Sequence, residues 1–264
     1  YLEGGRAILG WKGGRSLLTF KSLLDRGLTG TFETPEQKQL EQAIRNLAPQ
    51  HRVVRWYQNK EKAQNACARY LGLWIDDLPL VENEAVRNRM FLLQSDALFQ
   101  ANGICLWRPW IEDAWYNIDE EIRESLQDLS WCSADITVFP IPFPAGGEFY
   151  AVAFSTDKGD QILPSDPLPA VVAGAMARAC NDLYAEIPKR WEQDWQQYDK
   201  IIGEYWLRRG PYLVPEIPEE QYRDFFLRCL DMGILISPDF NIPSIVPVGA
   251  DKSALDKLAK KSTP

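Results

Sequence analysis

The sequence is poor in the side chains that build metal sites and catalytic triads. It has a single histidine, His51, which makes a histidine-based metal centre or a Ser–His–Asp triad improbable. Because His51 precedes a β-prone run, we expect it to be a capping or surface residue. The five cysteines are scattered and odd in number, which argues against a zinc site or a disulfide framework. They are Cys67, Cys105, Cys132, Cys180 and Cys229. Their apolar surroundings predict buried thiols in a reducing compartment, the cytoplasm.

Long apolar runs and basic blocks are also lacking. No stretch approaches the roughly 20 apolar residues that cross a bilayer, and the first ten residues lack the layout of a signal peptide, so we expect no membrane association. The net charge of −8 argues against nucleic acid as a partner, since phosphates require a positive face. The lysines near the end of the chain alternate with Asp251 and Asp256, which favours a solvated helix face.

What is present is an ordinary globular composition with many tryptophans. The chain has 264 residues, of which 45% are hydrophobic, and this length suffices for one large domain or for a large and a small one. Two helices carry clear signals. Thr34, Pro35 and Gln37 form the start of a helix that should end before Pro49, and residues 60–71 read as a helix ended by Gly72.

The remaining pattern alternates helices and strands. We expect further helices at residues 14–26, 83–101, 117–128, 167–186, 189–208, 218–232 and 251–261. We expect strands at residues 52–57, 104–107, 135–139, 149–154, 212–214, 234–237 and 242–247. The alternation predicts an α/β body followed by an α+β end, and there are no internal repeats.

Residues 131–181, WCSADITVFPIPFPAGGEFYAVAFSTDKGDQILPSDPLPAVVAGAMARACN, resemble the segment of a pyridoxal-phosphate (PLP) aminotransferase that carries the Schiff-base lysine. That family places an aspartate, four mostly apolar residues, a glycine and the lysine in a row. Here Asp135 is followed by Ile136, Thr137, Val138, Phe139 and Pro140, and Ile141 stands at the lysine position. No lysine lies between Arg123 and Lys158. Only lysine supplies the primary amine of a Schiff base to PLP.

Three other stretches extend the resemblance to class-III aminotransferases of PLP fold type I, of which glutamate-1-semialdehyde aminomutase is an example. Residues 24–72 are similar to the family's cap, strand and phosphate-turn helix, with Arg69 and Ala63 at matching positions. Residues 163–184 and 205–260 are similar to the helix after the lysine and to the small domain. The resemblance implies a PLP-transferase fold with a reduced, mostly parallel central sheet flanked by helices. It implies a major domain over residues 1–187, a connecting helix and small α+β domain over residues 188–264, and a homodimer.

Two departures concern the groups that hold PLP in that family. The Ser-Gly-Thr phosphate turn is replaced by Asn59-Lys60-Glu61, which loses the close approach of backbone N–H groups and adds a carboxylate. Arg108 or Pro109 falls near the aspartate that pairs with the pyridine nitrogen, and Asp113 follows nearby. The chain is also shorter than a full class-III enzyme. We therefore expect no cofactor, no metal and no catalytic residue.

Several residues remain as binding candidates. Lys60 and Ser165 are candidates for a residual anion site, although Ser165 also suits a helix cap. Trp107, Arg108, Trp110 and Asp113 are candidates for a ligand pocket with aromatic walls. The alternative is that these tryptophans fill space left by a lost cofactor. A further group is expected on the helix at residues 189–208, where core packing or a subunit contact is the favoured role: Trp191, Trp195 and Trp206.

The sequence thus supports two hypotheses of function. The first is a non-catalytic, aminotransferase-like protein (a pseudoenzyme) that acts as a binding, regulatory or interaction module, with a small molecule or an enzyme as partner. The second is a PLP-dependent aminotransferase or aminomutase that recruits a displaced lysine such as Lys158, or a new activity in the remodelled cleft. Lys158 lies in a polar turn, where a solvated, protonated amine is a poor nucleophile.

Overall fold

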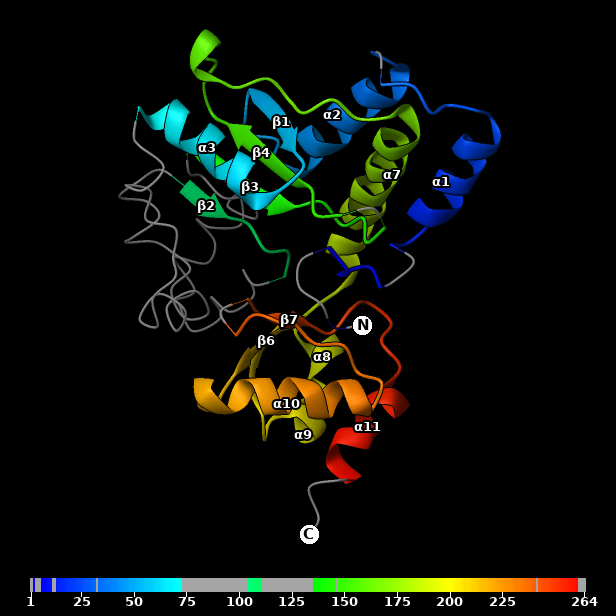
Figure 1. Ribbon diagram of the computed structural model, residues 1–264, viewed down its shortest axis with the longest axis vertical. Helices are drawn as coiled ribbons and strands as arrows, with labels where there is room; N and C mark the ends of the chain where they lie inside the picture. The colour runs from blue at the N-terminus through cyan, green and yellow to red at the C-terminus, as the bar shows by residue number, and fades with distance from the viewer. Residues whose placement is uncertain are drawn as a thin grey trace.

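The computed structural model describes residues 2, 6–10, 13–31, 33–72, 104–110, 135–145, 147–240 and 242–260. Figure 1 shows a four-stranded sheet with its helices at the top of the view and a three-stranded sheet with α10 and α11 at the bottom. The helices expected at residues 83–101 and 117–128 lie outside the described residues, as does Asp113.

The larger sheet has the order β1-β4-β3-β2. Its strands are β1 (Val53–Tyr57), β4 (Tyr150–Phe154), β3 (Ile136–Pro140) and β2 (Ile104–Leu106). β4 is antiparallel to both of its neighbours, whereas β2 is parallel to β3. β1, β2 and β3 therefore run in one direction, and this mostly parallel sheet confirms the expected α/β fold class.

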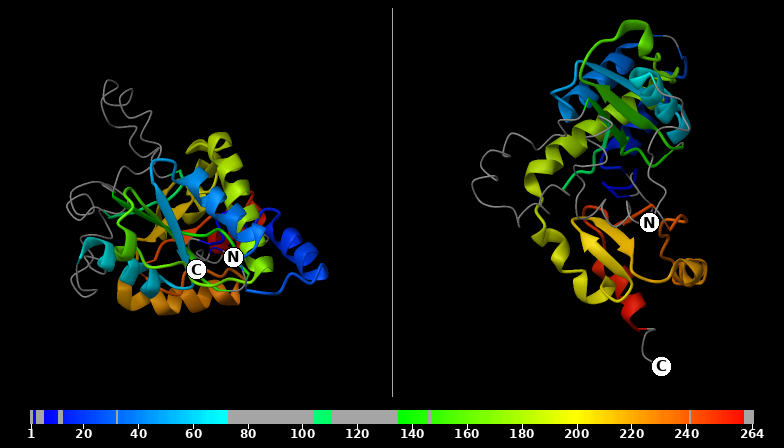
Figure 2. Two further views of the ribbon diagram at one scale, coloured as in Figure 1. Left: turned by 90° about the horizontal axis from the view of Figure 1, so that it is seen from above. Right: turned by 90° about the vertical axis from the view of Figure 1, so that its left-hand side faces the viewer.

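Helices cover both faces of this sheet, as mostly parallel sheets require. The alternation of side chains along β4 shows the two faces. Ala151 and Ala153 belong to the core beneath α2 (Pro35–Leu47) and α7 (Ala170–Glu186). Val152 and Phe154 belong to a second cluster beneath α3 (Lys60–Leu71). The two views of Figure 2 place α7 on the opposite side of the sheet from α3. α1 (Ser16–Asp25) packs on α7.

The starts of α2 and α3 follow from their caps. The backbone N–H of Thr34 donates to Oε1 of Gln37 at 3.4 Å, which is one arm of the expected capping box. The amide of Gln37 also donates to the carbonyl of Leu168, so the start of α2 is tied to the segment before α7. Asn59 caps α3 by accepting the N–H of Lys62 at 2.8 Å. Gly72, with φ of 70°, ends α3.

The expected helix over residues 189–208 is wrong. The chain instead forms η5 (Ile187–Lys189), α8 (Gln193–Gln196), α9 (Asp199–Ile202) and then strand β5 (Trp206–Arg209). The guanidinium of Arg208 binds Glu192 and Asp199, and these ion pairs hold β5 against the two short helices.

The tryptophans of this segment consequently do not share a helix face. Trp191 precedes α8 and is 55% exposed, whereas Trp195 within α8 is 2% exposed. Trp206 is buried in β5. The spacing of Trp191 and Trp195 was compatible with one helical face, but the helix begins only after Trp191.

The smaller sheet has the order β5-β6-β7, with all pairs antiparallel. β6 is Tyr212–Pro215, and β7 is reduced to Ser244–Ile245 within the expected run of residues 242–247. α10 (Glu219–Asp231) and α11 (Lys252–Lys260) confirm the two expected helices. The strand expected at residues 234–237 does not form, because the N–H of Ser237 donates to a side chain, Oγ of Ser244, instead of joining a ladder.

The start of the chain lies against this smaller sheet. The N–H of Leu2 donates to the carbonyl of Leu235 at 2.6 Å, and the carbonyl of Leu2 accepts the N–H of Ile245 at 2.7 Å. Val248 similarly donates to the carbonyl of Ile8. The N-terminal residues therefore pack with the C-terminal elements, although most of residues 1–187 belongs to the larger sheet and its helices.

Other expectations can be compared with the described residues. His51, between α2 and β1, is 6% exposed and is therefore not a surface residue. Cys67, Cys180 and Cys229 are free and buried, as expected. Across the described ranges, no helix is long and apolar enough to span a bilayer. The same ranges contain no cluster of three or more His, Cys, Asp or Glu side chains suited to a metal ion.

Candidate functional site

The larger sheet has one edge at which its three parallel strands end. β1 ends at Tyr57, β2 at Leu106 and β3 at Pro140, and the antiparallel β4 begins there at Tyr150. In α/β sheets, ligands bind outside the carboxyl ends of the parallel strands. This edge is therefore where the candidate residues need to lie, and Trp107, Arg108 and Ile141 directly follow their strands there.

Ile141, the residue at the position of the family's lysine, lies in the apolar core. Its exposed fraction is 0%, and it belongs to the same buried cluster as Phe139 and Phe143. Its backbone N–H donates to the carbonyl of Phe149 at 2.7 Å, which continues the hairpin beyond β3 and β4. The position thus carries a packed hydrocarbon side chain and no amine.

Lys158, the displaced lysine considered above, lies at the opposite edge. It follows β4, and because β4 is antiparallel to β1 and β3, it emerges where those strands begin. Its Nζ donates to the carbonyl of Tyr70 at 3.1 Å and lies 3.9 Å from the centre of the Tyr70 ring. A cation held by a carbonyl and an aromatic face near the end of α3 cannot reach Ile141's edge of the sheet.

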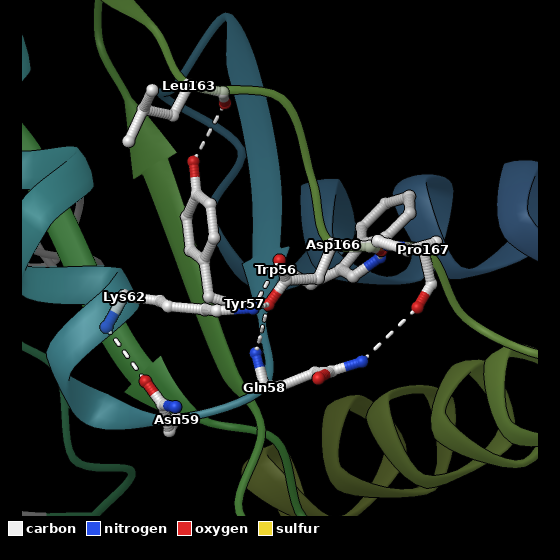
Figure 3. A network of polar contacts seen from close by, with 8 residues as sticks. All are labelled: Trp56, Tyr57, Gln58, Asn59, Lys62, Leu163, Asp166 and Pro167. Atoms are coloured by element: carbon white, nitrogen blue, oxygen red, sulfur yellow. Dashed lines mark hydrogen bonds and ion pairs between the residues drawn. The ribbon is translucent and has the colours of Figure 1, made fainter.

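A network of polar contacts occupies the end of β1 and the start of α3 (Figure 3). The carboxylate of Asp166 accepts the backbone N–H of Gln58 at 2.8 Å and binds Nζ of Lys62 at 3.0 Å. The backbone of Asp166 also donates to the carbonyl of Trp56. The chain therefore places one of its own carboxylates at the helix start where the resemblance locates a phosphate.

The two candidates for a residual anion site, Lys60 and Ser165, come from the two segments that this network joins. Ser165 is partly buried, and its Oγ accepts the backbone N–H of Trp56 at 3.3 Å. Lys60 is exposed in the first turn of α3. No hydrogen bond joins these two described residues, and the Asp166 carboxylate, bound at the start of α3, disfavours a second anion there. The Lys60–Ser165 site stays a prediction.

Trp107 and Trp110, by contrast, are packed into the core. Trp107 is 4% exposed, and its ring meets Phe139 edge-on with a centroid distance of 5.1 Å. Trp110 is 6% exposed; its Nε1 donates to the carbonyl of Ile187, and its ring lies 5.3 Å from that of Trp195. These contacts agree with the interpretation that the tryptophans fill space, and they join the end of β2 to the segment around α8.

Arg108 lies between these tryptophans and remains partly accessible. Its guanidinium carbon is 5.8 Å from the centre of the Tyr212 ring, at the start of β6. Desolvation by burial lowers the pKa of Arg108 to about 10, against smaller opposing effects of Tyr212 and Tyr150. Arg108 therefore keeps its charge at neutral pH in an environment that disfavours it.

Sequence reasoning missed the residues that are brought here by the fold. Asp166 and Lys62 are 104 positions apart, and no local motif links them. Tyr212 was expected only as part of a strand. Tyr150, whose hydroxyl donates to Glu148 at 3.3 Å, was expected only within a strand as well. Only the order of the strands could have indicated that β4 begins beside the ends of β1 and β3.

Comparisons with solved structures identify the fold. A serine palmitoyltransferase variant from S. paucimobilis with a bound PLP–myriocin aldimine aligns with a TM-score of 0.61 and 12% identity over 97% of this chain and 85% of that chain. Acetylornithine aminotransferase from Elizabethkingia anophelis aligns with a TM-score of 0.57 and 14% identity over 97% and 85%. Ornithine aminotransferase from Plasmodium yoelii has a TM-score of 0.57 and 11% identity over 97% and 84%. The fold is thus that of the PLP fold-type-I aminotransferases.

These structures correct the expectation that no cofactor is involved. Similar structures are described as holding PLP, among them the serine palmitoyltransferase variant and a transaminase. The expectation of no cofactor, inferred from three departures in sequence, was therefore wrong, since structures that share this fold hold PLP.

Comparison of sequences identifies a relative that is more similar in sequence than these structures are. No family model matches the chain. An "Uncharacterized protein" of Treponema pallidum (strain Nichols) is 32% identical over 262 residues, which cover 94% of this chain and 82% of the relative. With this identity over nearly the whole length, the chain belongs to the same family as the Treponema pallidum protein, and that family has the aminotransferase-like fold.

Proposed function

We propose that this protein is a non-catalytic member of the aminotransferase fold, a module that binds a small molecule at the carboxyl edge of its larger sheet without forming a Schiff base at position 141. Such a module regulates or complements an enzyme through its bound ligand. The observation that carries the proposal is the burial of Ile141: its exposed fraction is 0%, and its neighbours Phe139 and Phe143 are equally apolar. An isoleucine offers no nucleophile.

The described residues do not fit PLP in the covalent form used by the aminotransferases. The lysine position is hydrocarbon, and Lys158 emerges at the other edge of the sheet. At the start of α3, the N–H of Gln58 is already bound by the Asp166 carboxylate, which would repel a phosphate. Any pyridoxal phosphate that this protein binds is held non-covalently at the carboxyl ends of the parallel strands, beside Ile141.

The assembly and the compartment are part of the same proposal. We propose a major domain of residues 1–187 and a C-terminal unit of residues 188–264; the separation of the strands into two sheets supports this division, although Leu2 binds Leu235. We propose a homodimer, by analogy with the fold, and a cytoplasmic location, which suits the free thiols of Cys67, Cys180 and Cys229. Sedimentation velocity of the purified chain measures the assembly, and a monomer at micromolar concentration would refute the dimer.

The decisive experiment is borohydride reduction of the full chain after incubation with PLP, followed by peptide mass mapping and absorption spectroscopy. We expect no pyridoxyl-lysine that rises stoichiometrically with PLP on any one peptide. A stoichiometric adduct on a single lysine, together with a visible aldimine band, would replace this proposal by that of an enzyme and would identify the lysine.

A matched variant controls for accidental labelling. Lys158→Arg keeps the charge near Tyr70 and removes the amine considered as an alternative nucleophile. If PLP labels only surface lysines of the unaltered chain, the variant loses only the small amount of labelling at position 158. If Lys158 is the true nucleophile, the variant loses the aldimine band entirely.

A further inference from the structure

The Arg108 guanidinium has no anionic partner in the described part of the chain. Its recorded contact is the ring of Tyr212, 5.8 Å from the guanidinium carbon. Arg208 provides the contrast within the same protein. Its side chain is similarly enclosed, with 6% exposed, yet it binds the carboxylates of both Glu192 and Asp199. Among the described residues, Arg208 is therefore paired with two carboxylates, whereas Arg108 contacts only an aromatic face.

A cation without a counter-ion in such a place is costly. Moving a charge out of water disfavours it unless an opposite charge or several hydrogen bonds replace the lost hydration. The lowered pKa of Arg108, about 10, has desolvation as its main cause, and Tyr212 and Tyr150 offset it only in part. A guanidinium presents five N–H donors in a planar fork, a geometry that fits a carboxylate or phosphate group in two parallel hydrogen bonds.

The position of Arg108 is that of a ligand site. The N–H of Trp107 donates to the carbonyl of Val138, so Arg108 is the first residue beyond the parallel pairing of β2 with β3. It lies at the edge where parallel strands end, and Tyr212 belongs to the smaller sheet. Figure 1 shows the segment after β2 running toward β6 and β7. Ligands of α/β proteins bind outside this edge and between domains.

Charges of both signs act on the neighbouring Tyr150, and Glu148 acts on it more strongly than either arginine. Arg6 and Arg108 both act on Tyr150, at the start of β4. The described carboxylate nearest to this tyrosine is that of Glu148, which is exposed and accepts the Tyr150 hydroxyl. Tyr150 is thus under the influence of Arg6 as well as Arg108, and its carboxylate partner, Glu148, is an exposed residue.

We propose that Arg108 binds the carboxylate or phosphate group of a small molecule that enters at the carboxyl ends of β2 and β3, with Tyr212 beneath the guanidinium. This inference names the ligand class of the module proposed above and rests on that proposal. It assigns the counter-charge to the ligand, so that the site is complete only when an oxyanion is bound.

The test is a titration of the full chain with inorganic phosphate in one arm and with succinate in the other, at constant ionic strength. Trp107 and Trp110 flank Arg108 and serve as fluorescent reporters. We expect saturable binding in at least one arm, and the arm that saturates identifies the group as phosphate or carboxylate. Arg108→Met should weaken that binding on the order of 10- to 100-fold, because it removes charge-assisted hydrogen bonds.

The stability of the variant separates a ligand-binding arginine from a structural one. Without added anion, Arg108→Met should leave Tm unchanged or raise it, since an uncompensated charge is replaced by an uncharged, apolar side chain. Phosphate or succinate should raise the Tm of the unaltered chain and not that of the variant. A marked fall in Tm of Arg108→Met, or no saturation in either arm, would overturn the inference.

Arg223→Met is the matched control, because Arg223 is exposed on α10 and its loss changes net charge equally. It should bind the anion as the unaltered chain does. Equal weakening in both variants would show general electrostatic attraction and would also overturn the inference. The failure of this inference is distinct from that of the proposed function, which is decided by the reduced PLP adduct and does not involve Arg108.

Discussion

The carboxylate of Asp166 lies 3.0 Å from Nζ of Lys62, and one side chain thereby ties the segment before α7 to the first turn of α3. The two partners differ in exposure, since Lys62 is 47% exposed and Asp166 only 15%. The same carboxylate accepts the N–H of Gln58. Asp166 is therefore the structural centre of the contact, and Lys62 is a peripheral partner.

Asp166→Ala is expected to lower the free energy of unfolding by about 1–3 kcal/mol, because the N–H of Gln58 loses a charged acceptor. Lys62→Met should cost less than about 1 kcal/mol, as exposed ion pairs do. Urea denaturation of both variants measures the difference. Equal losses would show that the ion pair, and not the backbone contact, is the stabilising part.

Gly210 is expected to be intolerant of a side chain. It has φ of +49°, and a Cβ there would lie 2.9 Å from the carbonyl oxygen of Trp110. Gly233 is the matched control, because its φ is +78° and a Cβ would meet nothing within 4 Å. Gly210→Ala should cost about 1–3 kcal/mol more than Gly233→Ala, since overpacking adds to a shared backbone strain. Comparable losses, measured by thermal unfolding, would contradict a tight contact between the β5–β6 turn and Trp110.

The tryptophans near α8 should differ sharply in their contribution to stability. Trp195→Ala is expected to cost about 3–5 kcal/mol, because it opens a cavity beside Trp110 and removes the hydrogen bond from Nε1 to the carbonyl of Val246. Trp191→Ala should change stability by no more than about 0.5 kcal/mol, since that ring is 55% exposed. Chemical denaturation of both variants distinguishes them, and similar costs would place Trp191 in an interface.

The thiols of Cys67 and Cys229 should resist alkylation in the native state. Burial raises the pKa of each to about 12 from the ordinary value of 9.0, so neither forms thiolate at pH 8. Iodoacetamide labelling with peptide mass mapping should modify both only after unfolding. These thiols do not change the free energy of unfolding below pH 9. As the pH rises from 9 toward 12, the free energy of unfolding declines, because only the unfolded chain loses the thiol protons.

The sequence predicted best where local chemistry decides the structure. α3 begins at Lys60 and ends before Gly72, because a capping asparagine and a left-handed glycine act over single residues. The family resemblance predicted the fold, and the antiparallel β4 within a mostly parallel sheet agrees with it.

The sequence predicted worst where tertiary contacts decide. Residues 189–208 have helical spacing, but Arg208 binds Glu192 and Asp199 from β5 and thereby ends the helix early. The candidate site shows the same limit. Arg108 could be identified as a pocket candidate from its tryptophan neighbours. Tyr212 lies about a hundred residues further along the chain, and only the fold brings it to Arg108.

The contact of Leu2 with Leu235 and Ile245 has a consequence for how the protein is made. The smaller sheet obtains one backbone partner from Leu2 and the others from residues far along the chain, Leu235 and Ile245. Closing a loop between residues so far apart in sequence is slow relative to local pairing. During synthesis the larger sheet can form first, while the partners of Leu2 have yet to be added. A C-terminal fragment expressed by itself would lack the edge that Leu2 provides.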